Sequence, residues 1–161
     1  MVTNKNLFLI CPDCTIERTI ENKFGRNTCF LTALGSVFNF SDFNHASALN
    51  RFLHDEAIAE IIVVNDTHCT FINNVICKNN NYNTIAEKEL PKIQTNNSEK
   101  LAQLNVDQQK EFLAELNIYR QAYELLDVAF VGSKISDETI KISGLIYNRN
   151  SSKFKRITLD L

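Results

Sequence analysis

The stretch from Ile61 to Cys69 reads Ile-Ile-Val-Val-Asn-Asp-Thr-His-Cys, and it is the best guide to the fold. Its first four residues are all β-branched, which favours an extended strand. Because no polar residue interrupts them, the pattern is typical of a strand buried on both faces of a parallel sheet. The strand is followed at once by Asp66, His68 and Cys69, three side chains of the kinds that bind metal ions.

A second apolar run, from Leu7 to Ile10, is followed in the same way by Cys11-Pro12-Asp13-Cys14. In open α/β sheets, ligands bind beyond the carboxyl ends of the strands. Neighbouring strands lie about 5 Å apart, so groups at the ends of two strands can converge on one ion. Two thiolates with a carboxylate or an imidazole suit zinc, and the sequence therefore predicts a zinc site at this edge of the sheet.

The rest of the chain alternates between helical and strand-like patterns. Helices are expected at residues 16–23, 42–53, the start of 73–83 and 107–127, and strands at residues 30–34, 128–131, 140–147 and 154–159. Residues 95–98 are expected to form a loop and residues 87–92 a solvated surface, while Gln121 is placed off the apolar face of the long helix. This order predicts one α/β domain over residues 1–161, with a mostly parallel central sheet flanked by helices and a C-terminal hairpin.

Net charge, the N-terminal apolar run and the cysteine count indicate which partners and which cellular compartment to expect. The formal net charge is -2 and the pI is about 5.9, with no basic stripe, so we expect no binding to nucleic acid or to an anionic membrane. The run from Leu7 to Ile10 is too short for a signal-peptide core or a membrane span. Because this run is too short, we expect a cytoplasmic protein. Five cysteines are an odd number, which favours free thiols or metal ligands over a disulfide framework.

Other interpretations of these residues stay open at this point. Cys11 and Cys69 are also compatible with buried free cysteines that pack as small hydrophobic residues. Asp66 is also compatible with the N-cap of a following helix, and Asp13 has the same alternative.

Cys11 and Cys14 form a Cys-x-x-Cys motif directly after a strand. This spacing is found in thiol-disulfide redox sites and in two-cysteine zinc clamps. A thioredoxin-like redox fold also needs a later cis-proline that faces the motif. The only other proline, Pro91, lies in a stretch that we interpret as a loop, so the redox interpretation is the weaker one.

The two strand ends also resemble those of β-class carbonic anhydrases, and the resemblance extends over nearly the whole chain. That family has a strand ending in Cys-x-Asp-Ser-Arg and a later strand ending in Gly-His-x-x-Cys. Residues 11–15 fall on the first motif and residues 65–69 on the second. Residues 30–37 take the place of the strand that leads into Arg-Asn-Ala-Gly-Asn, and residues 142–148 are similar to the Gly-Trp-Val-Tyr-Asp hairpin.

The resemblance implies zinc-dependent interconversion of carbon dioxide and bicarbonate, at a site formed at a subunit interface, and hence a homodimer. It implies that Cys11 and Cys69 are the two thiolate ligands. It also implies that Asp13 is the catalytic carboxylate, which accepts a hydrogen bond from the zinc-bound hydroxide.

Several positions depart from the family pattern. The ligand histidine is replaced by Asp66, which adds a negative charge and should raise the pKa of a zinc-bound water. The motif arginine is Thr15, so Asp13 is free to bind the metal and close the site. The small residues after the second cysteine are Thr70 and Phe71, which should crowd the space above the metal. The predicted ligands are Cys11, Asp66, Cys69 and, with a remodelled turn, His68, and the fourth position is open among Asp13, Cys14, His68 and water.

These departures predict a divergent β-carbonic-anhydrase-like protein with weak or no activity. One alternative is a working zinc-dependent carbonic anhydrase, or a hydrolase of a related small electrophile. The other alternative is a thiol-redox domain that uses Cys11 and Cys14.

Overall fold

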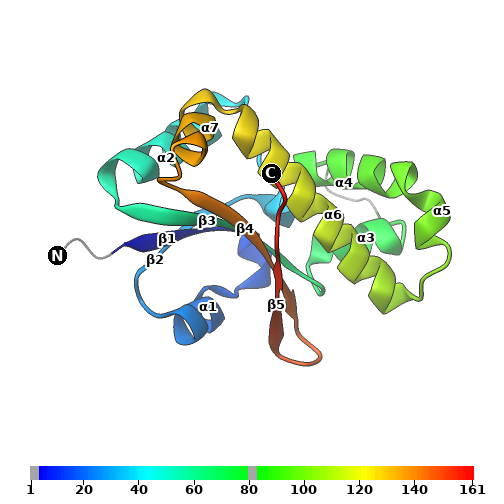
Figure 1. Ribbon diagram of the computed structural model, residues 1–161. Coiled ribbons are helices and arrows are strands. Elements are labelled where there is room, and N and C mark those ends of the chain that lie inside the picture. Colours follow the sequence, from blue (N-terminus) through cyan, green and yellow to red (C-terminus); the bar gives the residue numbers. More distant parts are fainter. Residues whose placement is uncertain (1–3, 80–82) are drawn as a thin grey trace.

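The computed structural model describes residues 4–79 and 83–161, and its centre is a five-stranded sheet (Figure 1). In spatial order the strands are β2 (Thr28–Thr32), β1 (Lys5–Ile10), β3 (Ile58–Asp66), β4 (Lys141–Asn148) and β5 (Lys153–Ile157). The first four are parallel to one another, and β5 pairs antiparallel with β4. The predicted α/β class, the mostly parallel sheet and the C-terminal hairpin are confirmed.

Helices pack against both faces of this sheet. They are α1 (Glu17–Phe24), α2 (Phe43–Asp55), α3 (Thr70–Ile76), α4 (Ile85–Asn96), α5 (Ser98–Leu101), α6 (Val106–Asp127) and α7 (Ala129–Ser136), with short 3₁₀ turns η1 (Pro12–Cys14) and η2 (Leu34–Ser36). Across the described parts of the chain, no helix has the length and apolar character needed to cross a membrane.

Alternate residues of the central strands belong to two separate hydrophobic clusters. Phe8 of β1 and Ile62 of β3 lie in the cluster on one face, whereas Leu9 and Val63 lie in the cluster on the other. This alternation is the period of two expected for a strand buried on both sides, as the apolar runs predicted. The first cluster also contains the three cysteines that lie beyond the ends of β1 and β3.

The predicted type of secondary structure is wrong for two stretches of the chain. Residues 128–131 are expected to form a strand, but Val128 is the N-cap of α7 and Val131 is buried on that helix. A short apolar run does not distinguish a strand from a buried helical turn. The stretch around Pro91 and most of residues 95–98 are helical rather than loop, and residues 87–92, expected as a solvated surface, include the buried Glu87 and Leu90.

Helix α4 explains the second error. Thr84 and Glu87 form a capping box that starts the helix. Leu90 and Ile93 then bury its apolar face, although Pro91 stands inside it and cannot donate a backbone hydrogen bond. Packing outweighs the local preference of proline here.

The prediction that Gln121 lies off the buried face of α6 is also wrong. Gln121 is fully buried, and its Oε1 accepts a hydrogen bond from the backbone N–H of Phe38 at 2.8 Å. Asn117, also fully buried, donates to the carbonyls of Gly35 and Ser36 and to Asn65 Oδ1. These two polar side chains hold the segment after β2 against the long helix, because its backbone groups would otherwise be buried without partners.

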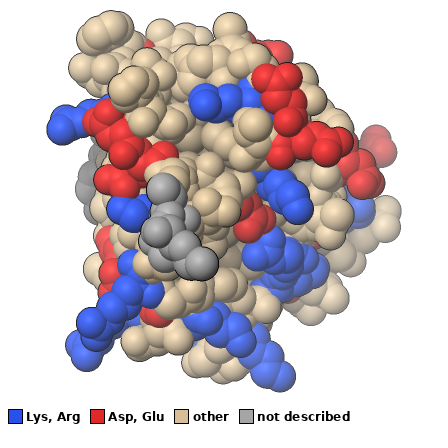
Figure 2. All heavy atoms as spheres, turned by 60° about the vertical axis from the view of Figure 1, so that its left-hand side comes forward, with Lys and Arg blue, Asp and Glu red and all other residues tan. Residues whose placement is uncertain are grey.

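Charges of both signs occur on one face of the molecule. Figure 2 shows lysine and arginine side chains mostly toward the lower part of the view, and acidic side chains mostly toward the upper part, with some of each sign in both. This mixture matches the small net charge of -2.

Candidate metal centre

Three cysteine sulfur atoms lie within 4.8 Å of one another at the carboxyl ends of β1 and β3. Cys11 directly follows β1, Cys14 ends the η1 turn, and Cys69 is the N-cap of α3. The three residues are 2%, 3% and 3% exposed, so the cluster is inaccessible to bulk water. Within the described parts of the chain, it is the one group of potential ligand atoms this close together.

Local sequence explains how Cys14 reaches the other two thiols. Pro12 suits the first position of the η1 turn, because its fixed φ matches a helical start. The backbone N–H of Cys14 donates to the carbonyl of Cys11 at 3.2 Å, and this closes the turn. Thr15 then leaves it in the left-handed conformation, with φ of 49°.

The three thiols perturb one another. Hydrogen bonds from the thiols of Cys14 and Cys69, and from the backbone N–H of Gly35 at 3.1 Å, lower the pKa of Cys11. The contact with Cys11 in turn raises the pKa of Cys14 and that of Cys69, because each would have to form a second thiolate beside Cys11. The cluster therefore carries one favoured thiolate stabilised by two neighbouring thiols.

Asp66, predicted as a ligand, lies outside this group of sulfurs. Its carboxylate accepts a hydrogen bond from Arg149 Nε at 2.6 Å and another from the backbone N–H of His68 at 2.8 Å. The side chain of Asp66 is 0% exposed. Arg149 also donates from Nη2 to the backbone carbonyl of Cys14.

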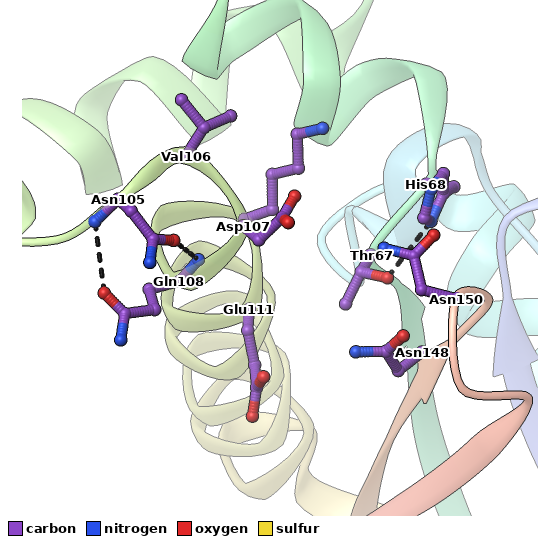
Figure 3. Close-up of a pocket in the computed structure, with 10 residues that line it drawn as sticks. Thr67, His68, Asn105, Val106, Asp107, Gln108, Glu111, Asn148 and Asn150 are labelled. Atoms are coloured by element: carbon purple, nitrogen blue, oxygen red, sulfur yellow. Dashed lines mark hydrogen bonds between the residues drawn. The ribbon is translucent and has the colours of Figure 1, made fainter.

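His68 and Asp13 also lie outside the group. Asp13 is exposed on the η1 turn. His68 is exposed and lines a polar cavity of about 410 Å³, where Thr67 and His68 face Asn148 and Asn150 across from the start of α6 (Figure 3). None of the three clustered cysteines lines this cavity, so β3 separates two environments at its end.

The sequence predicted that side chains at the two strand ends converge, and the structure brings Cys11 and Cys69 together there. Cys14 is the third member of the cluster. From the sequence, Cys14 is only one of several choices for the fourth position. Arg149 is not identifiable from the sequence at all, because it lies 83 residues after Asp66, in the β4–β5 turn. An arginine in a polar turn carries no motif that would single it out.

Comparison with known proteins identifies the family and the fold. The pattern of the carbonic anhydrase family matches residues 7–154, almost the whole chain. The chain belongs to the β-carbonic anhydrase family. A search of curated proteins gave no match.

Solved β-carbonic anhydrases share the fold of this family member. CafD of the filamentous fungus Aspergillus fumigatus superposes with a TM-score of 0.85 at 16% identity, over 98% of this chain and 91% of that one. A tetrameric enzyme of Sordaria macrospora gives 0.84 at 13% identity, over 97% and 81%. The Coccomyxa enzyme, solved with acetazolamide, gives 0.74 at 16% identity, over 95% and 71%. At these identities the likeness concerns the fold.

The residues present fit a zinc ion. Three thiols close enough to share one ion offer the soft donor atoms that favour zinc and other thiophilic metals. Gly35 supplies a backbone hydrogen bond to one of the sulfurs, as groups around metal ligands commonly do. This β-carbonic anhydrase homologue therefore has a cluster compatible with a metal centre made of sulfur.

Proposed function

We propose that this protein binds zinc through Cys11, Cys14 and Cys69 and has little or no carbon dioxide hydration activity. The observation that carries the proposal is the convergence of three buried sulfurs within 4.8 Å. The residue at the position of the family's ligand histidine, Asp66, is instead paired with Arg149.

Charge and access both argue against rapid hydration. Bound zinc supplies Lewis acidity that lowers the pKa of a coordinated water, and it does so best when its ligands leave positive charge on the ion. Three thiolates would leave a formal charge of about −1 on the site, which opposes formation of hydroxide. Phe71 is only 5% exposed and packs in the same cluster as the cysteines, so little room is left for substrate.

The residues that would orient the zinc-bound hydroxide are also altered. Asp13 matches the family's catalytic carboxylate, but it is exposed, and the arginine that would restrain it is replaced by Thr15. Asp13 is thus kept as a candidate catalytic residue only for a residual reaction.

Metal content and activity together test the proposal. Protein purified without chelators should contain about one zinc per chain by mass spectrometry, and Cys14→Ser should lose most of it. Cys77→Ser is the matched control, because Cys77 is exposed and outside the cluster, and it should keep its zinc. Stopped-flow measurement should give hydration far below that of an active carbonic anhydrase.

Other outcomes would contradict the proposal. Zinc with hydration at an ordinary enzymatic rate would support a working carbonic anhydrase instead. Absence of zinc after reconstitution, together with a reversible disulfide between Cys11 and Cys14, would support the redox alternative.

We also propose a homodimer in a reducing compartment such as the cytoplasm. Two observations support this proposal: the family resemblance implies a site at a subunit interface, and the Sordaria macrospora relative is tetrameric. All five cysteines are free thiols in the structure, which suits a reducing environment. Sedimentation velocity would contradict the dimer if the protein stayed monomeric at micromolar concentration.

A further inference from the structure

Arg149 lies in the turn between β4 and β5, on the face of the sheet that carries the cysteines. In the register of the parallel pair, Asp66 is opposite Tyr147, and the pairing continues through a hydrogen bond from Thr67 N–H to the Tyr147 carbonyl at 3.0 Å. Tyr147 packs against the hydrophobic cluster that contains the cysteines. Arg149 follows two residues later, in the turn after β4, and its hydrogen bonds to Asp66 and to the Cys14 carbonyl place its guanidinium beside the cysteine cluster.

The guanidinium of Arg149 contacts both Asp66 and Cys14, the two candidates for the third metal ligand. Nε donates to Asp66 Oδ2 at 2.6 Å, while Nη2 donates to the backbone carbonyl of Cys14. The neighbours of Arg149, Asn148 and Asn150, line the cavity on the other side (Figure 3). Arg149 is thus the residue of this turn that faces the sulfur cluster.

The Asp66 carboxylate would be costly without this arginine. Its side chain is 0% exposed, and a buried carboxylate needs a partner of opposite charge or a metal. The side chain of Arg149 is 40% exposed, so the guanidinium keeps part of its own solvation. Arg149 therefore supplies the opposite charge that the buried Asp66 carboxylate needs when it binds no metal ion.

We infer that Arg149 is a positioning residue that selects Cys14 over Asp66 as the third metal ligand. This inference rests on the proposed zinc site. Asp66 occupies the chain position at which the family has its ligand histidine, and Cys14 occupies a neighbouring position on η1. Arg149 holds the Asp66 carboxylate away from the metal and fixes the backbone of Cys14. Its positive charge also offsets the negative charge of three thiolates.

The variant Arg149→Gln tests the inference, with zinc affinity and sulfur coordination as readouts. Chelator competition should show affinity lower by about 10- to 100-fold, the usual effect of removing a group that supports a ligand. X-ray absorption at the zinc edge should show one sulfur replaced by oxygen, since a freed Asp66 competes with Cys14. Adding Asp66→Asn to Arg149→Gln should restore three sulfurs, because a neutral amide is a poor zinc ligand.

Two further variants complete the design. Arg156→Gln is the matched control: Arg156 is similarly exposed, at 49%, and pairs with Glu60 on the sheet, so zinc binding should be unchanged. Arg149→Lys keeps the charge but lacks the fork that reaches both partners, and it should weaken zinc binding. Circular dichroism of the metal-free proteins checks folding, and if Arg149→Gln does not fold, Arg149→Lys decides by the same measurements.

The outcomes separate this inference from the proposed function. If the wild type binds zinc and Arg149→Gln keeps three sulfurs and full affinity, the inference is overturned while the zinc site stands. A loss of sulfur that Asp66→Asn does not reverse also overturns it, because Arg149 would then support only the fold. A wild type without zinc overturns both.

Discussion

Gly35 contacts the cysteine cluster through its backbone, and a glycine is required at this position for two reasons. Its N–H donates to Cys11 Sγ at 3.1 Å. Its backbone φ is 67°, a conformation that residues with a side chain rarely adopt. A Cβ at this position would lie 2.8 Å from the Cβ of Ala86 on α4. The family resemblance aligns Gly35 with the glycine of the Arg-Asn-Ala-Gly-Asn segment, and the contacts of Gly35 explain why a side chain does not fit there.

Gly35→Ala should destabilise the protein by about 1–3 kcal/mol in urea unfolding, because α4 or the backbone has to move. Zinc affinity should fall as well, since the hydrogen bond to Cys11 would be displaced. Gly25→Ala is the matched control: Gly25 also has positive φ, at 90°, but a Cβ added there would have no atom within 4 Å. Equal losses for the two variants would show that the contact with Ala86 does not matter.

At the scale of elements, the long helix α6 is held to the sheet by close packing as well as by polar contacts. Gly144 on β4 allows this approach, because a Cβ there would lie 2.3 Å from Cγ2 of Ile118 on α6. Arg120 on α6 pairs with Glu89 on α4, which also accepts from Lys92 at 2.7 Å. Helix α6 thus determines how α4, and with it the Gly35 segment, sits against the sheet.

Gly144→Ala should destabilise the protein by about 1–3 kcal/mol, the usual cost of overpacking a core. Ile118→Ala removes the obstructing methyl group, so the double variant should lose less than the sum of the two single variants. Denaturant unfolding of all four proteins gives the coupling energy. Simple additivity would mean that helix and strand move apart freely.

The pairing of Glu89 makes part of the stability dependent on pH. Hydrogen bonds from Lys92 and Arg120 lower the pKa of Glu89 below its ordinary 4.5. A lowered pKa in the folded state contributes stability above pH 4.5 that is lost as the pH falls through the folded value.

Glu89→Gln should therefore cost about 0.5–1 kcal/mol at neutral pH and progressively less as the pH is lowered below 4.5, as measured by urea unfolding at one neutral and one acidic pH. Glu99→Gln, on the exposed surface of α5, should show no such difference between the two pH values. A cost for Glu89→Gln that is constant with pH would mean that packing, not charge, is lost.

At the scale of the whole molecule, a metal ion would join segments far apart in the chain. Cys11 and Cys14 follow β1, whereas Cys69 begins α3 after β3, and the three sulfurs meet at one edge of the sheet. An ion held there would be bound by the folded state and only weakly by the unfolded one, so it should stabilise the whole fold.

Chelation of the metal should lower the melting temperature. With zinc at about a hundred times its dissociation constant, linkage adds about 3 kcal/mol, or about 6–10 °C for a domain of this size. The melting temperature of Cys14→Ser should hardly respond to chelator. Differential scanning fluorimetry with and without chelator makes the comparison, and equal responses of the two proteins would exclude Cys14 as a ligand.

The sequence by itself determined the architecture and the family. Runs of apolar and β-branched residues at 7–10 and 61–64 report burial on both faces, and this signal is local and needs no knowledge of neighbouring segments. The order of the motifs at the two strand ends placed Cys11 and Cys69 together. The predictions for residues 128–131, for the stretch around Pro91 and for Gln121 are wrong, because tertiary packing there outweighs local preference.

Only the tertiary structure decided which side chains complete the site. Asp66 and Cys14 both lie within reach of the two strand ends, and their sequence positions do not rank them. Arg149, which the antiparallel hairpin brings back 83 residues after Asp66, binds the Asp66 carboxylate and the Cys14 carbonyl, and buried Asn117 of α6 binds the carbonyls of Gly35 and Ser36. Such contacts depend on through-space distances between distant segments, which no local pattern of residues records.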